Sequence, residues 1–172
     1  MRGSITQFLS QLARRGSWMG GGSATALSAA VAAALLQKLV QNRRTSRRLE
    51  DIRQECVELV EADAAVFARV IRATRSRRPE VFRRSLKQAI EIPYRVFVHA
   101  HTLQAMCRSA QRRIRPQFQS DLRCAQALAH AAAVAARGFM ATNLAWLRDP
   151  DYTMTMRRRL RAATRSHGRR RA

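Results

Sequence analysis

The sequence predicts an all-α protein, a single-domain bundle of five to six helices. Apolar residues recur every three or four positions along almost the whole chain, which is the spacing of one helix face. No segment of the sequence alternates apolar and polar residues as a half-buried strand does. The chain has 172 residues, 47% of them hydrophobic, so it is long enough to bury one core.

The first two predicted helices flank a glycine-rich turn. The first is expected from about Ser4 to Arg14, and the second from Gly21 to about Asn42. The second is made largely of Ala and Ser and carries almost no charge, which favours a buried helix over a membrane span. Arg14 and Arg15 before this apolar run also imitate a bacterial export signal, whose cleavage would remove the longest apolar helix.

The third and fourth helices are expected over Ser46–Arg75 and Pro79–Arg113. Thr45 or Ser46 is predicted to cap the third helix, because their hydroxyls can accept a free backbone N–H. Pro93 must kink the fourth helix, since proline lacks the N–H that would bond the carbonyl of Ala89. That carbonyl is expected to face a cavity or a helix crossing.

The fifth helix is expected from Ser120, its predicted cap, to Arg148, and a short basic helix follows Pro150. The second and fifth helices are both rich in alanine, so they can lie close together. They would form either the centre of the bundle or the seam of a homodimer or higher homo-oligomer. The predicted domains are a helical domain over residues 1–152 and a basic C-terminal extension over residues 153–172.

Positive charge dominates the chain, with 33 Lys and Arg against 11 Asp and Glu and a net charge of +22. A charge this large predicts association with polyanions such as nucleic acid, an anionic membrane, or a substrate with several carboxylates or phosphates. Many single arginines are also explained as solvated cations near helix ends. The tail over residues 157–172 has no acid, and we expect it to be partly disordered and to hold phosphate backbones nonspecifically.

The cysteines and histidines do not form a recognisable site. Cys56, Cys107 and Cys124 are odd in number and widely spaced, so neither a disulfide framework nor a zinc site is predicted. The four histidines have no metal-binding spacing, and we expect no metal and no catalytic histidine. These features fit a reducing cytoplasm, with no membrane association.

Two features could form a ligand site. Gly20, Gly21, Gly22 and Ser23 open the second helix, and glycines there bring backbone N–H groups close to a bound anion. The alternative is a tight turn before a closely packed helix. Asp63 has apolar neighbours three and four residues away, so it is either a general base with a raised pKa or a buried partner of an arginine.

Two further polar residues are candidates with simple structural alternatives. Asp121 follows Ser120, where it either binds a ligand or stabilises the first turn of the helix. Asn143 is an amide in an apolar helix, where it either bonds a ligand or ties two helices together. By contrast, Glu55, Glu58 and Glu61 form a stripe that is most simply exposed to solvent.

Taken in order, six short motifs resemble the cyclodeaminase/cyclohydrolase family over about residues 4–152. This family contains the C-terminal domain of formiminotransferase-cyclodeaminase and stand-alone methenyltetrahydrofolate cyclohydrolases, which are oligomeric all-α bundles. The motifs are Phe8-Leu9, Gly20-Gly21-Gly22-Ser23, Leu59 to Phe67 around Asp63, Ala89 to Pro93, Ser120-Asp121-Leu122, and Asn143-Leu144.

The resemblance implies chemistry on a tetrahydrofolate derivative as substrate, with no bound cofactor and with Asp63 as the acid/base. It implies that Gly20 to Ser23, Asp121 and Asn143 surround the folate, and that the basic surface holds its glutamate or polyglutamate tail. The chain has no formiminotransferase domain, which favours methenyltetrahydrofolate cyclohydrolase, with formimidoyltetrahydrofolate cyclodeaminase as the alternative. A third possibility follows from departures such as Met19 where the family has proline: a non-catalytic scaffold of the same fold that binds RNA or another polyanion.

Overall fold

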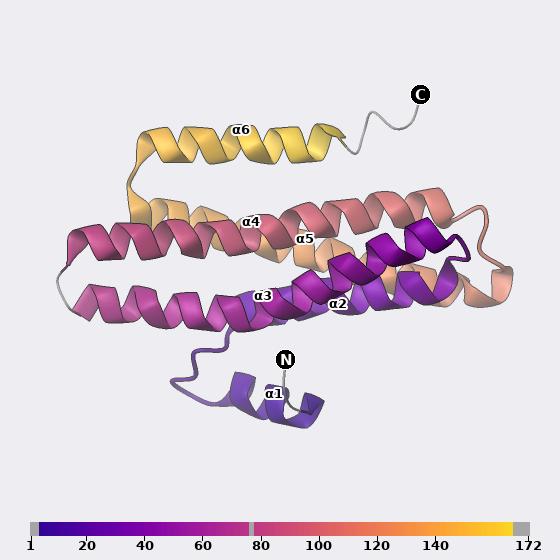
Figure 1. Ribbon diagram of the computed structural model, residues 1–172, viewed down its shortest axis with the longest axis horizontal. Helices are drawn as coiled ribbons and strands as arrows, with labels where there is room; N and C mark the ends of the chain where they lie inside the picture. Colours follow the sequence, from indigo (N-terminus) through magenta and orange to yellow (C-terminus); the bar gives the residue numbers. More distant parts are fainter. Residues whose placement is uncertain (1–3, 76–77, 167–172) are drawn as a thin grey trace.

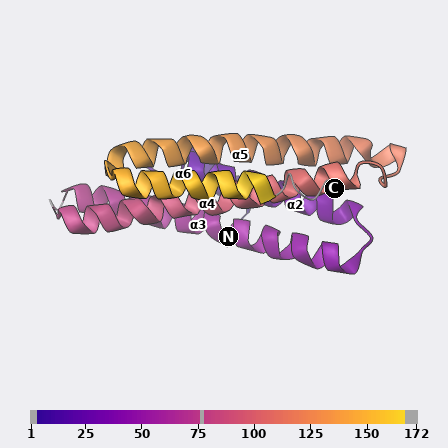
Figure 2. The ribbon, with the colours of Figure 1, turned by 90° about the horizontal axis from the view of Figure 1, so that it is seen from above.

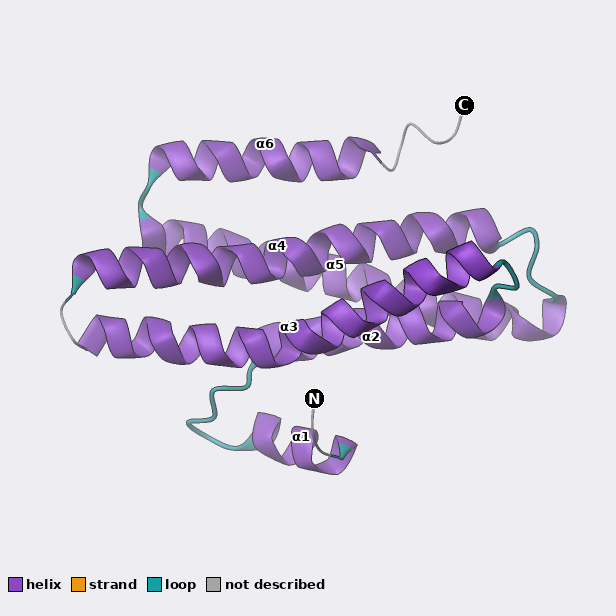
Figure 3. Ribbon diagram, in the orientation of Figure 1, coloured by secondary structure: helices purple, strands orange, loops and turns teal. Residues whose placement is uncertain are grey.

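The computed structural model describes residues 4–75 and 78–166, which form six α-helices and one short 3-10 helix, with no strand among them. The all-α prediction is confirmed. Four long helices make a bundle, with a short helix outside it on either side (Figures 1 and 3). The elements are α1 (Ile5–Ala13), α2 (Gly21–Leu39), α3 (Arg43–Arg75), α4 (Pro79–Ala110), η1 (Pro116–Phe118), α5 (Gln119–Leu147) and α6 (Pro150–Ser166).

Helix α2 contacts the three other long helices, α3, α4 and α5. Its inner positions, among them Ala26, Ala29 and Ala33, are fully buried, and Ala129 and Ala132 are their counterparts on α5. Side chains that end at Cβ let the backbones approach closely, so burial here comes from tight packing of many small contacts. The two alanine-rich helices thus lie side by side, as predicted, and their role in the seam of a homo-oligomer stays a prediction.

Helix α2 also has the length and composition of a membrane span, with a mean hydropathy of 1.2. It is the one such helix among the described residues. Its neighbours α3 and α5 nevertheless cover it on two sides, as the core helix of a bundle is covered. The prediction that the chain does not associate with a membrane stays a prediction.

Two predicted helix caps are wrong. Helix α3 begins earlier, at Arg43, because the Asn42 side chain accepts the Thr45 N–H at 2.9 Å and so caps the helix itself. Helix α5 begins at Gln119 directly after the 3-10 turn, and no side chain caps it. The turn delivers the backbone already in helical geometry, so Ser120 lies inside the helix rather than before it.

Pro93 is buried inside α4, and the helix continues through it. The carbonyl of Ala89, whose helical partner proline cannot supply, accepts a hydrogen bond from Asn143 Nδ2 at 2.7 Å. Because Asn143 lies on α5, this bond joins the two helices at their crossing. The prediction that the freed carbonyl lies at a helix crossing is confirmed.

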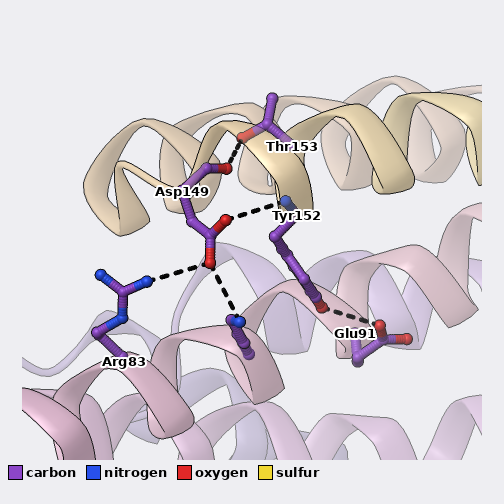
Figure 4. Close-up of polar contacts among 6 residues, drawn as sticks. Arg83, Glu91, Asp149, Tyr152 and Thr153 are labelled. Carbon is purple, nitrogen blue, oxygen red and sulfur yellow. Dashed lines mark hydrogen bonds and ion pairs between the residues drawn. The ribbon is translucent and has the colours of Figure 1, made fainter.

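The predicted basic helix after Pro150 is present as α6, and it includes residues 157–166 of the basic extension. Residues 167–172 lie outside the described residues. Helix α6 runs alongside α4 in both views of the molecule (Figures 1 and 2). Asp149 starts it by accepting the Tyr152 N–H at 3.0 Å, and its carboxylate also pairs with Arg83 at 3.2 Å and Lys87 at 3.1 Å on α4 (Figure 4).

Glu91 on α4 binds two residues of α6 through its carboxylate. Both of its carboxylate oxygens accept from the Arg159 guanidinium, and the Tyr152 hydroxyl donates to it at 3.0 Å. The Arg159 guanidinium also lies 4.1 Å from the centre of the Tyr94 ring. Arg159 hydrogen bonding keeps the pKa of Glu91 below its usual value. At least one arginine of the basic tail is therefore part of the fold rather than free for a polyanion.

Candidate functional site

The candidate site lies where α3 passes the first turn of α2. Ser23 Oγ lies 3.0 Å from Asp63 Oδ2 and 3.0 Å from the carbonyl oxygen of Val60. Ser23 is fully buried, whereas Asp63 is only partly buried. Among the ion pairs of residues 4–75 and 78–166, none includes Asp63. The contact partner of this carboxylate is therefore a hydroxyl, not an arginine.

Gly22 provides the space that the carboxylate fills. A Cβ atom on Gly22 would lie 2.3 Å from Asp63 Oδ1 and 2.6 Å from Oδ2, which is closer than real Cβ atoms approach. The Asp63 side chain therefore rests directly on the backbone at the start of α2. Because the first N–H groups of a helix have no helical partner, a carboxylate is favoured there. The Asp63 carboxyl thus occupies the place beside the glycine run where the sequence predicts a bound anion, and the role of the run in binding a ligand stays a prediction.

The protonation of Asp63 is balanced between opposing effects. Burial raises the pKa of its carboxyl, while hydrogen bonds from the Ser23 hydroxyl and backbone N–H lower it, and the net pKa is raised. Of the two sequence interpretations of Asp63, the raised pKa agrees with the general base rather than with the partner of an arginine, and the catalytic role stays a prediction. Such a carboxyl holds its proton closer to neutral pH than an exposed aspartate does, as a group that both gives and takes protons requires.

Ser23 can serve both forms of Asp63 without moving. A hydroxyl has one proton to donate, and the carbonyl of Val60 can only accept. When Asp63 is protonated, it can donate to Ser23 Oγ while the hydroxyl donates to Val60. When Asp63 is ionised, the same hydroxyl can turn its proton to Oδ2. Both arrangements use the observed 3.0 Å separations, so only the proton has to change position.

Three partly exposed aromatic side chains lie on the segments that form the site. Trp18, Phe67 and Phe139 are 44%, 43% and 36% exposed. The rings of Trp18 and Phe67 meet edge to face with centres 6.3 Å apart, and a Cβ on Gly21 would lie 2.6 Å from Phe139 Cζ. Phe67 is one helical turn from Asp63. Exposed rings beside a polar group of this kind can hold a flat ligand ring.

Neither Trp18 nor Phe139 was identified as a site residue from the sequence. The signal available for Phe139 was an aromatic residue directly after Gly138, at the end of the alanine-rich stretch. Its significance depends on α5 crossing the start of α2, which the sequence pattern does not specify. At Gly20 the structure does not require glycine for space, since a Cβ there would meet no atom within 4 Å.

The remaining predicted site residues lie elsewhere. Asp121 pairs with Lys38 at 2.9 Å, and Lys38 lies fifteen residues beyond Ser23 on α2, a distance of about 22 Å at the helical rise. Asn143 Nδ2 is used by the bond to Ala89. Within one chain the structure brings Asp63 together with Gly20 to Ser23 but not with Asp121. The substrate-binding roles of these residues stay predictions.

Other ionisable groups form structural pairs. Glu55 accepts from Arg95 and lies 3.0 Å from His99 Nε2, so this member of the glutamate stripe is partnered rather than simply solvated. Among the described residues, no three His, Cys, Asp or Glu side chains are grouped so that they could hold a metal ion.

Fold and site together define an all-α bundle that presents one partly buried carboxylate at the start of α2, near exposed aromatic rings. The family model described as formiminotransferase-cyclodeaminase matches residues 4–162. The chain therefore belongs to the formiminotransferase-cyclodeaminase family.

A solved structure supports the same fold assignment. The chain is similar to formiminotetrahydrofolate cyclodeaminase from Thermotoga maritima, with a TM-score of 0.88 and 21% sequence identity. The similarity covers 97% of this chain and 91% of that chain. No curated protein matches the sequence.

Proposed function

We propose that this chain is a formiminotetrahydrofolate cyclodeaminase in which Asp63 is the acid/base. The observation that carries the proposal is the partly buried Asp63 carboxyl, whose pKa is raised by burial and which accepts from Ser23 rather than from a cation. A carboxyl neutralised by an arginine would stay ionised and could not supply a proton near neutral pH. Family membership and the name of the similar structure supply the substrate class.

The proposed reaction closes a one-carbon bridge and releases ammonia. The N10 nitrogen of the folate attacks the formimino carbon on N5, and the proton of N10 passes to the imino nitrogen, which gives a tetrahedral carbon bonded to N5, to N10 and to an amino group. Asp63 in its acid form protonates this amino group, the bond between the carbon and the amino nitrogen breaks, and ammonia leaves a methenyl bridge between N5 and N10. The ionised Asp63 recovers its proton from solvent.

The surroundings of Asp63 fit the other parts of such a substrate. Trp18, Phe67 and Phe139 offer rings on which a pteridine can stack. The surplus of arginine gives a positive potential for the glutamate or polyglutamate tail. Tetrahydrofolate is a substrate in this proposal, and no separate cofactor is required.

Methenyltetrahydrofolate cyclohydrolase is the second candidate, with Asp63 taking the proton of an attacking water. Chain length does not favour it over the cyclodeaminase, because the similar cyclodeaminase structure is a chain of nearly this length, 91% covered by the present one. One experiment separates the two reactions. Purified protein is given formiminotetrahydrofolate or methenyltetrahydrofolate, and methenyl absorbance and released ammonia are followed. A cyclodeaminase gains absorbance and releases ammonia from the first, whereas a cyclohydrolase loses absorbance from the second.

A non-catalytic, RNA-binding scaffold is the third candidate, and it is supported only by the net charge of +22. Its binding would fall steeply with salt and would not depend on sequence. Inactivity on both folates with retention of RNA at moderate salt would favour it over the enzyme.

We also propose that the protein acts in the cytoplasm as a homodimer or higher homo-oligomer. Val31 on α2 and Val134 on α5 are exposed on the two alanine-rich helices, and exposed apolar groups on neighbouring elements favour burial against a second copy. Light scattering on the eluting protein measures the oligomer size, and a purely monomeric mass would contradict this assembly.

Replacing Ser23 with alanine is expected to raise the pKa of Asp63 further. The change removes a hydroxyl that donates to the ionised carboxylate, and such a bond favours the charged form. If turnover requires ionised Asp63, the rise of activity with pH should move to higher pH. If turnover requires the acid form, the fall of activity with pH should move to higher pH. The pH profile of turnover and the Asp63 carboxyl signal by NMR both report this change. Ser28→Ala on the same helix, whose hydroxyl bonds only the local Ala24 carbonyl, is the control and should leave the profile unchanged.

A further inference from the structure

A basic cavity lies at the end of the bundle away from Asp63. Its volume is about 880 Å³, and it is formed by the end of α2, the start of α3, the end of α4 and the segment leading to η1. Lys38 at its edge is about 22 Å along α2 from Ser23, from the helical rise. No residue that contacts Asp63 lines it. Within one chain it is therefore a separate feature from the proposed catalytic site.

The charge of this cavity is of one sign. None of its lining residues is acidic, and five are cationic: Lys38, Arg44, Arg48, Arg113 and Arg115. Lys38 pairs with Asp121 beside the cavity. The four arginines take part in none of the ion pairs between described residues. The start of α3 and the segment after α4 thus each place at the cavity two guanidinium groups that have no ion-pair partner among the described residues.

Helix stability does not explain two of these arginines. Cations are favourable near a helix C-terminus, where carbonyl groups point outward, and unfavourable at an N-terminus. Arg44 and Arg48 lie in the first two turns of α3, a helix of 33 residues with no acid in its first turn. Each of these guanidinium groups is therefore repelled both by the positive end of the helix dipole and by the other arginines. A bound anion would offset both, because helix N-termini and arginines each favour negative groups.

The cavity also has an apolar part. Leu39, Met106 and Ile114 line it and are partly buried against the core, and Phe118 contributes a ring that is 37% exposed. A site that needed only to attract a phosphate backbone would not require this lining. Apolar surface beside several cations suits a ligand that carries both an apolar body and closely spaced anionic groups.

We propose that this cavity is a second ligand site for a small organic polyanion, in which Arg48 and Arg113 hold phosphate or carboxylate groups and the apolar lining holds the ring or chain that carries them. Binding there is independent of Asp63, so the site goes beyond the proposed function and does not rest on it. The four arginines supply planar pairs of N–H donors that suit either anionic group.

The test is calorimetric titration of the full chain with adenosine triphosphate, benzenetricarboxylate and inorganic triphosphate. We expect saturable binding of at least one of the two ring-bearing anions, tighter than that of inorganic triphosphate. The variant R48Q/R113Q should bind it at least tenfold more weakly. The matched control R123Q/R137Q removes two exposed arginines of α5 and the same net charge, and it should bind as the wild type does. Asp63→Asn should also leave this binding unchanged.

Three results would overturn the proposal. Equal weakening by both double variants would mean that only the total charge matters. If inorganic triphosphate binds as tightly as the better-bound of the two ring-bearing anions, the apolar lining does not contribute to binding. Absence of saturable binding for all three probes, with short RNA retained, would assign the arginines to nucleic acid instead. Preference between adenosine triphosphate and benzenetricarboxylate decides whether phosphate or carboxylate is the group held.

Discussion

Replacing Asp63 with asparagine is expected to lower turnover by about 100- to 10,000-fold, the range contributed by a positioned acid/base, while the helical bundle stays intact. Asparagine has nearly the same shape, so it fits the space above Gly22. Its amide can donate to Ser23 Oγ at the observed distance while the hydroxyl donates to Val60. The variant therefore reproduces the contacts of the protonated carboxyl but cannot transfer a proton.

The same variant should be at least as stable as the wild type at neutral pH. Folding raises the pKa of Asp63. The free energy of unfolding is therefore highest at acid pH, where Asp63 is protonated in both states, and it falls as the pH rises from the unfolded pKa through the folded pKa. Asparagine carries no charge and removes this loss. Urea unfolding at acid and neutral pH measures the difference. A gain in stability together with a loss of turnover is the pattern of a functional residue held at some cost to folding.

Asp51 provides the control for Asp63. It lies on the same helix, three turns earlier, and is exposed, so Asp51→Asn should keep both turnover and the stability profile. If Asp63→Asn retains full activity on the substrate that the wild type converts, Asp63 has no part in the mechanism. If both variants lose activity equally, a change in net charge rather than acid/base chemistry explains the result.

The sequence predicted the order and type of the helices well because their cores follow one simple rule. Apolar spacing located all four long helices and the short helices on either side. The ends were less predictable, since several polar residues compete to cap each helix. Asn42, Thr45 and Ser46 can all cap α3 by residue type, and only the path of the chain after α2 selects Asn42.

The site was predictable in part. The apolar surroundings of Asp63 and the glycines at Gly20 to Gly22 are local patterns, and both were identified. Their meeting across 40 residues of sequence, through Ser23, is a property of how α2 packs on α3. The helix periodicity shows which face of each helix is apolar but not which neighbour covers it.

The role of Asn143 also depends on helix packing that the sequence does not specify. Its residue type suits a ligand contact and a helix tie equally well. The bond to the Ala89 carbonyl, which Pro93 leaves without its helical partner, favours the tie. The sequence contained both halves of this pair, in motifs 54 residues apart, but not the crossing that joins them.

Replacing Gly22 with alanine is expected to lower turnover about 100-fold, because an added Cβ would lie 2.3 Å from Asp63 Oδ1 and a displacement of about an ångström can cost that much in rate. Alanine favours a helix over glycine by about 1 kcal/mol, whereas forcing apart packed groups costs about 1 to 3 kcal/mol. Crowding therefore outweighs propensity, and the free energy of unfolding should fall. Turnover and urea unfolding measure the two effects.

Two other glycines separate crowding from loss of flexibility. Gly138→Ala on α5 meets no atom within 4 Å, so it should keep turnover and gain a little stability from helix propensity. Gly20→Ala also has free space in the protein, and a loss of turnover there with an unchanged Asp63 pKa would indicate that substrate occupies that space. Wild-type turnover in Gly22→Ala would show that the close contact between Gly22 and the carboxylate does not position Asp63. Because the three substitutions add the same methyl group, only its surroundings differ.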